Sequence, residues 1–215
     1  MDYKNIETYD YDLDESLIAQ TPIKERDHSK LLVVNKKDGN YKDEVFYNII
    51  NYLHKGDVLV LNNTKVLPSR IIGYKIDTNA KIEVLLLTDL GDNIWECLVR
   101  PQKRVHIGTV IKFDDDFTCE VVEVKDNGIT HVKLMFSGIL VEHLDKVGAM
   151  PLPPYIHEKL KDNSRYNTVY AKREGSAAAP TAGLHFTNEL LNEIREKGIE
   201  ILYVTLNVGG GTFRS

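Results

Sequence analysis

The sequence has only two cysteines and contains no long hydrophobic run. Cys97 and Cys119 match no metal-binding spacing and lie in apolar stretches, which indicates reduced residues of a hydrophobic core. No segment reaches the roughly 18 apolar residues of a membrane span, and the first residues lack the basic start and apolar core of a signal peptide. We therefore expect a cytoplasmic protein without a membrane segment.

The composition is that of an ordinary globular protein, with 42% hydrophobic and 27% charged residues among 215. This length allows one large domain or two small ones. The net charge is −5, and most of the acidic surplus lies in residues 71–146, which hold 13 acidic and 9 basic residues. Nucleic-acid affinity comes from Lys and Arg that neutralise phosphates, so the overall charge does not point to RNA but leaves room for a local basic patch.

The first 68 residues alternate between helical and strand-like patterns. They predict a short helix over 14–19, a strand over 31–35, a helix over 44–53 and a fully apolar strand over 58–61. The last of these strands ends in the polar cluster Asn62-Asn63-Thr64. Because α/β proteins usually place ligand contacts at such strand ends, we expect a binding site here.

Between Ser69 and Phe136 the pattern changes to short strands separated by turn signals. Apolar or alternating runs predict strands over 71–72, 82–87, 94–99, 109–113, 119–124 and 130–136. This succession is typical of a small all-β barrel or sandwich. We predict an α/β protein in which a β-barrel domain over 69–147 is inserted between two parts of a larger domain, 1–68 and 148–215.

The residues after this block predict a further set of elements. Helical spacing over 139–147 is followed by a proline-rich segment over 150–156, which we interpret as a return linker. A strand over 168–171, a loop over 174–185, a helix over 188–197 and a strand over 199–206 are expected next. Thr187 can cap the start of that helix, and Gly198 can end it.

The predicted loop from Gly175 to Phe186 consists largely of small residues, which let a backbone approach a ligand or another segment closely. His185 lies just before a helix and could act as a base or as a hydrogen-bond donor. The alternative is a tightly packed loop with a structural histidine, because one histidine without a partner carboxylate or serine specifies no chemistry.

A glycine run, Gly209 to Gly211, follows the last predicted strand. No Gly-Lys-Ser or Gly-Lys-Thr comes after it, and the sequence ends at Ser215. A P-loop and the first strand-to-helix turn of a Rossmann methyltransferase both require a helix at this point, so neither fits.

Two basic segments, 24–30 and 64–70, lie beside predicted strands and could hold an anionic substrate or RNA phosphates. A solvated charged surface is the alternative for both. Arg100, Lys103 and Arg104 form a third cluster in the β block, where this alternative is the stronger one.

Seven stretches, in this order, resemble the S-adenosylmethionine:tRNA ribosyltransferase-isomerase family of the queuosine pathway. They are LIAQTP (17–22), RDHSKLL (26–32), GDVLVLNNTKV (56–66), MPLPPYI (150–156), YNTVY (166–170), AAPTAGLHFT (178–187) and TLNVGGGTF (205–213). Any one of these stretches is weak alone, but all seven in order are highly specific to the family.

The resemblance implies an enzyme that transfers and isomerises the ribosyl group of S-adenosylmethionine onto 7-aminomethyl-7-deazaguanine at the tRNA wobble position. The products are epoxyqueuosine, adenine and methionine. The implied partners are tRNA and S-adenosylmethionine, which is consumed as a substrate, with no separate cofactor and no metal. The implied fold is a larger barrel-like α/β domain with a small β-barrel inserted. A base near the sulfonium is needed, because the sulfonium acidifies the adjacent ribose carbon.

On the matching positions, the resemblance implies that His185 is the catalytic or substrate-orienting residue. It implies substrate-binding roles for Arg26, Asp27, Asn62, Thr64, Lys65, Arg70, Tyr170, Ser176, Thr181, Asn207, Gly209, Gly210 and Gly211. A structural ion pair is the alternative for Arg26 and Asp27, and packing is the alternative for Tyr170.

The chain departs from the family pattern at several positions. Lysine stands for arginine at 30 and 65, asparagine for aspartate at 63, and asparagine for glutamine at 167; Asn207 stands where the family has histidine. Lysine keeps the charge but lacks the fork geometry of arginine, and Asn207 has no titratable group. Family members also continue past the Gly-Thr-Phe-Arg segment. The alternative to an active enzyme, which we expect to be a monomer, is therefore a catalytically inactive RNA- or partner-binding fragment.

Overall fold

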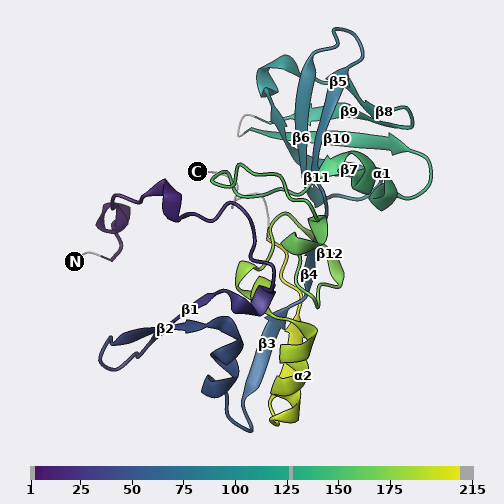
Figure 1. Cartoon of the computed structure of the whole chain (residues 1–215). Helices are drawn as coiled ribbons and strands as arrows, with labels where there is room; N and C mark the ends of the chain where they lie inside the picture. The colour runs from purple at the N-terminus through teal and green to yellow at the C-terminus, as the bar shows by residue number, and fades with distance from the viewer. Residues whose placement is uncertain (1–2, 126–127, 209–215) are drawn as a thin grey trace.

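The computed structural model describes residues 3–125 and 128–208 (Figure 1). It has a mixed α/β architecture in which a closed β-barrel lies at one end and an α/β part at the other (Figure 1). The chain from Tyr3 onward extends from the side of the molecule as an arm (Figure 1). No helix in the described ranges is both long and apolar enough to cross a membrane.

The barrel consists of six antiparallel strands in the order β5-β6-β7-β10-β9-β8, closed by pairing between β8 and β5. A two-residue strand, β11, pairs with the start of β5, on the edge whose other end pairs with β8. The strands are β5 (Arg70–Lys75), β6 (Lys81–Asp89), β7 (Ile94–Arg100), β8 (Val110–Asp114), β9 (Phe117–Val124), β10 (Ile129–Phe136) and β11 (Gly148–Ala149). All six predicted strands of this block are confirmed, and the structure makes most of them longer than the patterns indicated.

Closure of the barrel depends on a glycine. A Cβ atom at Gly73 would lie 2.7 Å from the Lys112 carbonyl oxygen and 2.6 Å from the Phe113 ring. Because only a residue without a side chain fits there, β5 can approach β8 closely enough to pair with it.

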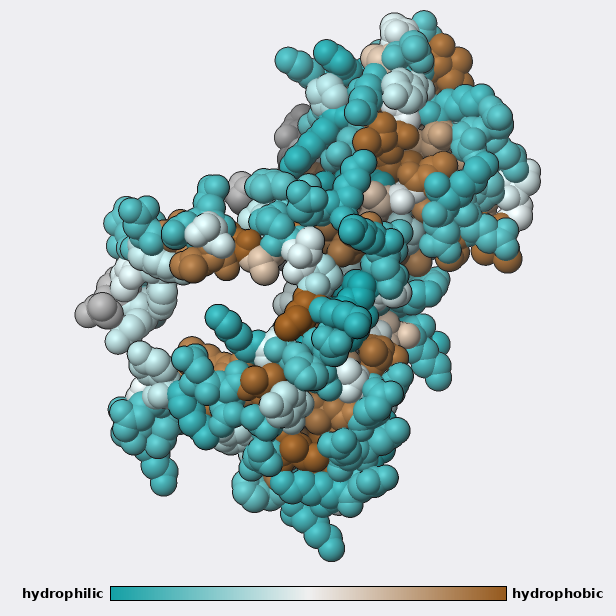
Figure 2. All heavy atoms as spheres, in the orientation of Figure 1, coloured by the Kyte–Doolittle hydropathy of each residue, from teal (hydrophilic) through white to brown (hydrophobic). Residues whose placement is uncertain are grey.

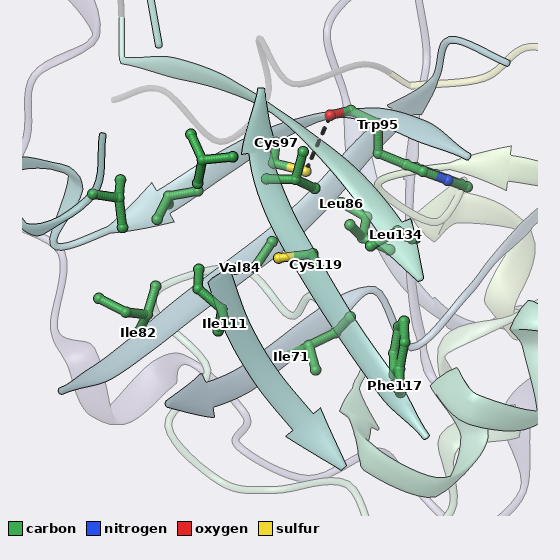
Figure 3. Close-up of a cluster of buried hydrophobic side chains, with 14 of the residues drawn as sticks. Ile71, Ile82, Val84, Leu86, Trp95, Cys97, Ile111, Phe117, Cys119 and Leu134 are labelled. Atoms are coloured by element: carbon green, nitrogen blue, oxygen red, sulfur yellow. Dashed lines mark hydrogen bonds between the residues drawn. The ribbon is translucent and has the colours of Figure 1, made fainter. Parts of the chain in front are cut away.

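Alternate residues of the barrel strands point inward and form its core (Figure 3). Ile71, Ile82 and Phe117 have no exposed surface, and burial of each such side chain contributes roughly 1.5–3 kcal/mol. Cys97 and Cys119 are free thiols in this core, which confirms their predicted state. Burial raises the pKa of Cys119 to about 12. The predicted helix after the barrel is confirmed as α1 (Leu140–Val147), which packs on the core.

The other part of the molecule is built from strands that precede and follow the barrel. β3 (Val58–Asn62) pairs in parallel with β13 (Glu200–Val204), and β4 (Thr64–Val66) pairs in parallel with β12 (Arg173–Ser176). Helix α2 (Asn188–Glu196) packs against one face of β3 and β13 through Leu190, Leu191 and Ile194. Parallel pairing brings residues roughly 110 to 140 positions apart in the chain to one edge, and this edge carries the candidate site.

The opposite face of β3 and β13 is exposed. Val58 is 51% and Val60 56% exposed on β3, and Leu202 is 46% exposed on β13. The pattern predicted a fully apolar strand, which is normally covered on both faces. Only one face is covered within the described residues, and hydrophobic side chains reach the surface where β3 lies (Figure 2).

The segment before β3 contains a hairpin and several 3-10 helices. The hairpin joins β1 (Lys30–Val34) to β2 (Tyr41–Val45), and the longest 3-10 helix follows it over Phe46–Tyr52. Shorter 3-10 helices in this segment span Ile6–Tyr9, Glu15–Leu17 and Arg26–His28. Three more lie after β3, over Gln102–Arg104, Asn163–Tyr166 and Thr181–His185. Gln20 anchors the N-terminal arm, because its side chain donates to the Tyr155 carbonyl at 3.0 Å and accepts from the His157 amide at 2.7 Å.

Several predicted elements are wrong. The helix over 14–19 is a single 3-10 turn, Glu15–Leu17, and the helix over 44–53 is a strand that pairs with β1 followed by a 3-10 helix. The strand over 168–171 is a turn, in which the Ala171 amide donates to the Thr168 carbonyl. The loop over 174–185 contains the end of β12 and a 3-10 helix. In each case, pairing with a distant strand or local chain reversal outweighs the local pattern.

Helix α2 behaves as its sequence predicts. The Thr187 hydroxyl accepts a hydrogen bond from the Leu190 amide at 3.1 Å, which caps the first turn. Gly198 follows the helix with a φ of +87°, a backbone conformation that favours glycine. Both predicted helix boundaries are therefore confirmed, and they place His185 two residues before the helix cap.

Candidate active site

The carboxyl ends of β3 and β13 meet at one edge, and Asn62 joins them. Its amide oxygen accepts from the backbone N–H groups of Thr64 at 3.2 Å and Leu206 at 3.0 Å. Its amide nitrogen donates to the Leu206 carbonyl at 2.9 Å. Asn62 therefore uses both the oxygen and the nitrogen of its side-chain amide to hold the segment after β13 beside β4.

Thr64 extends this network toward the small-residue segment. Its fully buried hydroxyl donates to the side-chain oxygen of Asn207 at 2.6 Å. A Cβ atom at Gly175, whose φ is +129°, would lie 2.9 Å from the Asn207 amide nitrogen. The Ser176 hydroxyl accepts from the Val208 amide at 2.9 Å and donates to the Ala178 carbonyl at 2.7 Å. The structure thus brings together four of the predicted site residues: Asn62, Thr64, Ser176 and Asn207.

Lys65 lies at the margin of this network, where its ammonium group is 3.1 Å from the Glu174 carboxylate. Both side chains are 40% exposed, so the pair contributes at most about 1 kcal/mol. Lys65 therefore keeps much of its surface open to solvent. The predicted site glycines Gly209, Gly210 and Gly211 lie outside the described residues.

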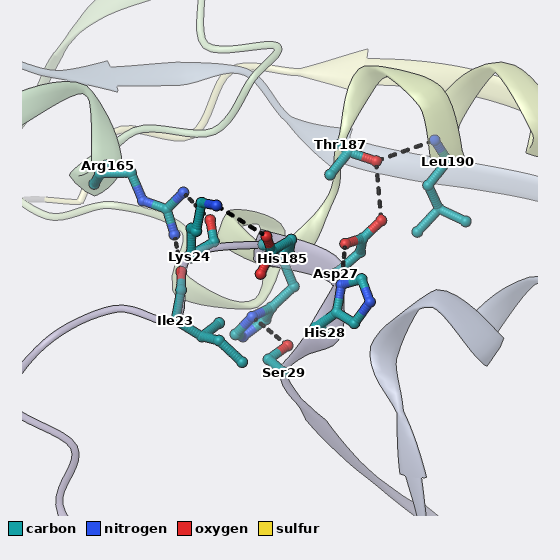
Figure 4. Close-up of polar contacts among 10 residues, drawn as sticks. Ile23, Lys24, Asp27, His28, Ser29, Arg165, His185, Thr187 and Leu190 are labelled. Carbon is teal, nitrogen blue, oxygen red and sulfur yellow. Dashed lines mark hydrogen bonds and ion pairs between the residues drawn. The ribbon is translucent and has the colours of Figure 1, made fainter.

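A second cluster surrounds His185. The Ser29 hydroxyl lies 2.8 Å from His185 Nδ1, with either group donating according to the imidazole tautomer (Figure 4). The imidazole is half-buried and contacts the Phe46 ring, with centroids 5.1 Å apart. Burial lowers the pKa of His185 below its ordinary value, so the imidazole is neutral at pH 7. A neutral imidazole oriented at Nδ1 leaves Nε2 as the atom that can exchange a proton with a ligand.

Arg26 clamps the backbone around this cluster. Its Nη1 donates to the carbonyls of Asn167 at 2.9 Å and Leu184 at 3.1 Å, and its Nη2 donates to the Ser164 carbonyl at 3.1 Å. Burial, followed by nearby Arg165, lowers the pKa of Arg26. The guanidinium therefore holds protein carbonyls, and it joins the N-terminal segment to the residues before His185.

Asn167 connects the two clusters. Its side-chain oxygen accepts from the Val66 amide at 2.8 Å, and its side-chain nitrogen donates to the Val66 carbonyl at 2.9 Å. Its own carbonyl accepts from Arg26. This asparagine fixes β4 of the strand-end network relative to the Arg26 clamp, so the two clusters belong to one framework.

Asp27 faces Thr187 at the start of α2 (Figure 4). One of its carboxylate oxygens accepts from the Thr187 hydroxyl at 3.4 Å, and the other lies 3.1 Å from His28 Nδ1. No ion pair joins Asp27 to Arg26 among the described residues. The two residues thus act on different segments, one at a helix start and one at a set of carbonyls.

Tyr170 packs beneath the His185 segment. Its ring lies 6.3 Å from that of Phe186 and 5.7 Å from that of Tyr203, and burial raises its pKa to about 12. A Cβ atom at Gly183 would overlap the Tyr170 hydroxyl, so this glycine allows the two segments to touch. Thr181 begins the 3-10 helix that ends at His185, and its side chain is exposed.

Sequence patterns did not assign roles to Ser29 and Asn167, although both lie within stretches that carry the family resemblance. Ser29 is 156 residues from His185, and Asn167 is 101 residues from Val66. No local spacing relates such pairs, so only their presence in those stretches marked them. No cluster of three or more metal-ligating side chains occurs in the part of the chain that the structure describes.

A family model described as queuosine biosynthesis protein matches residues 6–215. Curated relatives named S-adenosylmethionine:tRNA ribosyltransferase-isomerase come from Finegoldia magna, at 54% identity over 98% of this chain and 61% of the relative, and from Staphylococcus haemolyticus, at 54% identity over 98% of this chain and 62% of the relative. The chain thus spans about three fifths of the length of these relatives.

A solved structure also matches this chain. It is the S-adenosylmethionine tRNA ribosyltransferase of Thermotoga maritima, with 31% sequence identity and a TM-score of 0.38. The match covers 93% of this chain and 58% of that one.

Proposed function

Because this chain belongs to the family described as queuosine biosynthesis protein, we propose that it acts as an S-adenosylmethionine:tRNA ribosyltransferase-isomerase. The proposed reaction transfers and isomerises the ribosyl moiety of S-adenosylmethionine onto 7-aminomethyl-7-deazaguanine at the tRNA wobble position. Its products are epoxyqueuosine, adenine and methionine. The match over nearly the whole chain carries this proposal, and the His185 cluster supplies its chemistry.

His185 is the proposed base. The sulfonium makes a proton on the adjacent ribose carbon acidic, and a neutral imidazole can remove it. The lowered pKa keeps His185 neutral at pH 7, and Ser29 at 2.8 Å orients the ring from Nδ1. Loss of adenine with opening of the ribose ring, attack by the amine of the modified base, and closure of the epoxide with departure of methionine complete the transfer. Ser29 is therefore a positioning residue, and Nε2 is the atom that faces the reaction.

The strand-end network is the proposed support for the substrate. Asn62 and Thr64 hold the segment that contains Asn207, and this segment packs against Gly175 and Ser176. Small residues over 175–179 allow a ligand to approach the backbone itself. Asn207 presents a neutral amide here, so any proton transfer must come from another group.

The proposed domain arrangement is an inserted barrel. Residues 1–68 and 148–215 form parts of the larger domain, and residues 69–147 form the insertion. Parallel pairing of β3 with β13, and of β4 with β12, supports this arrangement, since each pair joins a strand before the barrel to a strand after it.

A second candidate is an RNA- or partner-binding protein without catalysis. The exposed apolar face of β3 and β13 favours it, because exposed parallel strands usually contact another segment or partner. This candidate predicts tRNA or partner binding without release of adenine.

The test is one reaction with this chain, ribose-labelled S-adenosylmethionine and tRNA that carries the deazaguanine precursor. The expected result is label in RNA together with an equal amount of free adenine. The His185→Asn variant should lose both, whereas His106→Asn, which changes an exposed barrel histidine, should keep both. tRNA binding by a folded chain without adenine release would refute the proposed reaction and favour the second candidate.

A further inference from the structure

Three arginines of the described chain are half-buried: Arg26, Arg70 and Arg165. Arg26 donates to three backbone carbonyls, and Arg165 donates to the carbonyls of Ile23 at 2.6 Å and Lys24 at 3.1 Å. Arg70 makes no side-chain hydrogen bond and no ion pair within the described ranges, and its Nε is buried without any partner. Buried polar groups are almost always satisfied, so this arginine differs from the other two.

The barrel register places Arg70 on the outer face. Its neighbour Ile71 is fully buried in the core, and side chains alternate along a strand, so Arg70 points outward. Leu85 on β6 and Ala149 on β11 are its direct cross-strand partners. Arg70 therefore stands in a row of outward-facing residues between these two apolar neighbours.

The small-residue segment of the candidate site crosses this row. Ala177 packs with Leu85 in one apolar cluster, and Ala179 packs with Met150, the residue after Ala149, in another. Leu85 is the direct cross-strand partner of Arg70, so the segment packs on a residue beside Arg70. Nε of Arg70 is buried, whereas its outer nitrogens keep solvent access, because they have no partner in the described structure and yet are not among the buried atoms without partners.

No carboxylate of residues 3–125 and 128–208 forms an ion pair with Arg70. The segment 175–179 contains no acidic residue. Glu83 is on the same outer face of β6, two residues from Leu85, but it forms no ion pair with Arg70 in the described structure. A half-buried guanidinium beside the contact between Leu85 and Ala177, with its outer end open and no anion of its own among the described residues, is arranged to receive one from a ligand.

We propose that Arg70 forms an anion subsite between the barrel and the small-residue segment. The subsite binds a carboxylate or phosphate group end-on through the two outer guanidinium nitrogens. This inference rests on the proposed function, which offers two sources for such a group: the methionine carboxylate of S-adenosylmethionine and a backbone phosphate of tRNA. The fork geometry of arginine suits either group bidentately, and it makes lysine a poor replacement.

The experiment compares Arg70→Met, Arg70→Lys and the charge-matched control Lys133→Met on the exposed outer face of the barrel. Methionine keeps the apolar stem under the segment, and circular dichroism with Trp95 fluorescence verifies folding. Binding of S-adenosylmethionine and of its decarboxylated analogue is measured by equilibrium dialysis, and tRNA binding is measured over a salt series.

Each source predicts its own result. If the ligand group is the carboxylate, Arg70→Met weakens S-adenosylmethionine binding by at least about tenfold and leaves the affinity for the decarboxylated analogue unchanged. Arg70→Lys then binds S-adenosylmethionine more tightly than Arg70→Met but more weakly than the wild-type chain. For the phosphate, Arg70→Met lowers the slope of log affinity against log salt for tRNA by about 1, which Lys133→Met does not. Wild-type affinities for all three ligands in Arg70→Met would overturn the proposal.

A separate readout keeps this test independent of the proposed function. Inorganic phosphate, compared with chloride at equal ionic strength, should raise the Tm of the wild-type chain and should not raise that of Arg70→Met. If the wild-type chain binds neither S-adenosylmethionine nor tRNA, the proposed function fails. The subsite then stands if the phosphate shift depends on Arg70, and it is refuted if the shift is the same in both proteins.

Discussion

Replacing Arg26 by methionine should release the two backbone segments that its guanidinium holds together. Methionine keeps most of the apolar stem but removes the donors to the carbonyls of Ser164, Asn167 and Leu184. Because these carbonyls flank the Tyr166 to Tyr170 turn and the His185 helix, the effect should be local to the candidate site.

The magnitude follows from the three bonds. A hydrogen bond from a charged donor contributes about 1.5–3 kcal/mol. The bond to Ser164 is exposed and contributes little, whereas the bonds to Asn167 and Leu184 are partly buried. Water replaces part of what is lost at these two carbonyls, so the expected loss is about 2–4 kcal/mol. Lysine can hold one of the carbonyls, and Arg26→Lys should lose roughly half as much.

Hydrogen exchange measured by mass spectrometry can detect this loss locally. Peptides that cover 163–170 and 181–187 should exchange roughly 30- to 1,000-fold faster in Arg26→Met, because about 1.4 kcal/mol corresponds to a factor of ten. A peptide that covers β7 of the barrel should be unchanged, since its hydrogen bonds lie within the closed sheet.

Unchanged exchange in both site peptides would refute the clamp. If the same variant then bound substrate weakly, Arg26 would instead be a ligand-binding residue, as the family resemblance implied. The two roles therefore give opposite results in one pair of measurements: faster exchange for a clamp, and weaker binding with normal exchange for a ligand.

Three further substitutions test other contacts. Gly183→Ala places a methyl group on the Tyr170 hydroxyl and should lower the free energy of unfolding, measured in urea, by about 1–3 kcal/mol. Adding Tyr170→Phe should recover part of this loss. Equal losses with and without Tyr170→Phe would contradict the overlap. Thr64→Val removes the hydrogen bond to Asn207 and should cost about 1 kcal/mol in the same assay, and no cost would mean that the bond adds nothing. His185→Asn should flatten the pH dependence of the free energy of unfolding. Burial lowers the pKa of His185 in the folded state, so the contribution of His185 to stability is complete above its ordinary pKa of 6.5 and is lost as the pH falls below that value. Equal slopes for the wild-type and variant chains would show that the pKa of His185 does not change on folding.

The barrel could be predicted because its information is local. Each strand is an apolar or alternating run closed by a turn signal, and antiparallel neighbours follow one another along the chain. The ends of α2 were equally local, since a capping threonine and a final glycine act within one turn. Such features depend on residues a few positions apart, and the sequence contains them directly.

The segments around the site could not be predicted in the same way. Residues 44–53 have apolar spacing that fits a helix, but Glu44 and Val45 complete a strand that pairs with β1. Residues 173–176 have no strand-like pattern, yet they pair with β4 more than 100 positions earlier. In both segments a hydrogen-bonding partner elsewhere in the chain decides the conformation, and local propensity carries no information about that partner.

By itself, the sequence determined the barrel strands, the helix before the last strand and the family to which the chain belongs, because these depend on spacing and order along the chain. Only the tertiary structure decided what the site residues do. It directs the Arg26 side chain to backbone carbonyls, places Ser29 beside His185 and leaves the Arg70 side chain without a partner among the described residues. The physical reason is that a polar side chain's role depends on which groups it meets across the fold, and parallel pairing brings those groups together from distant parts of the chain.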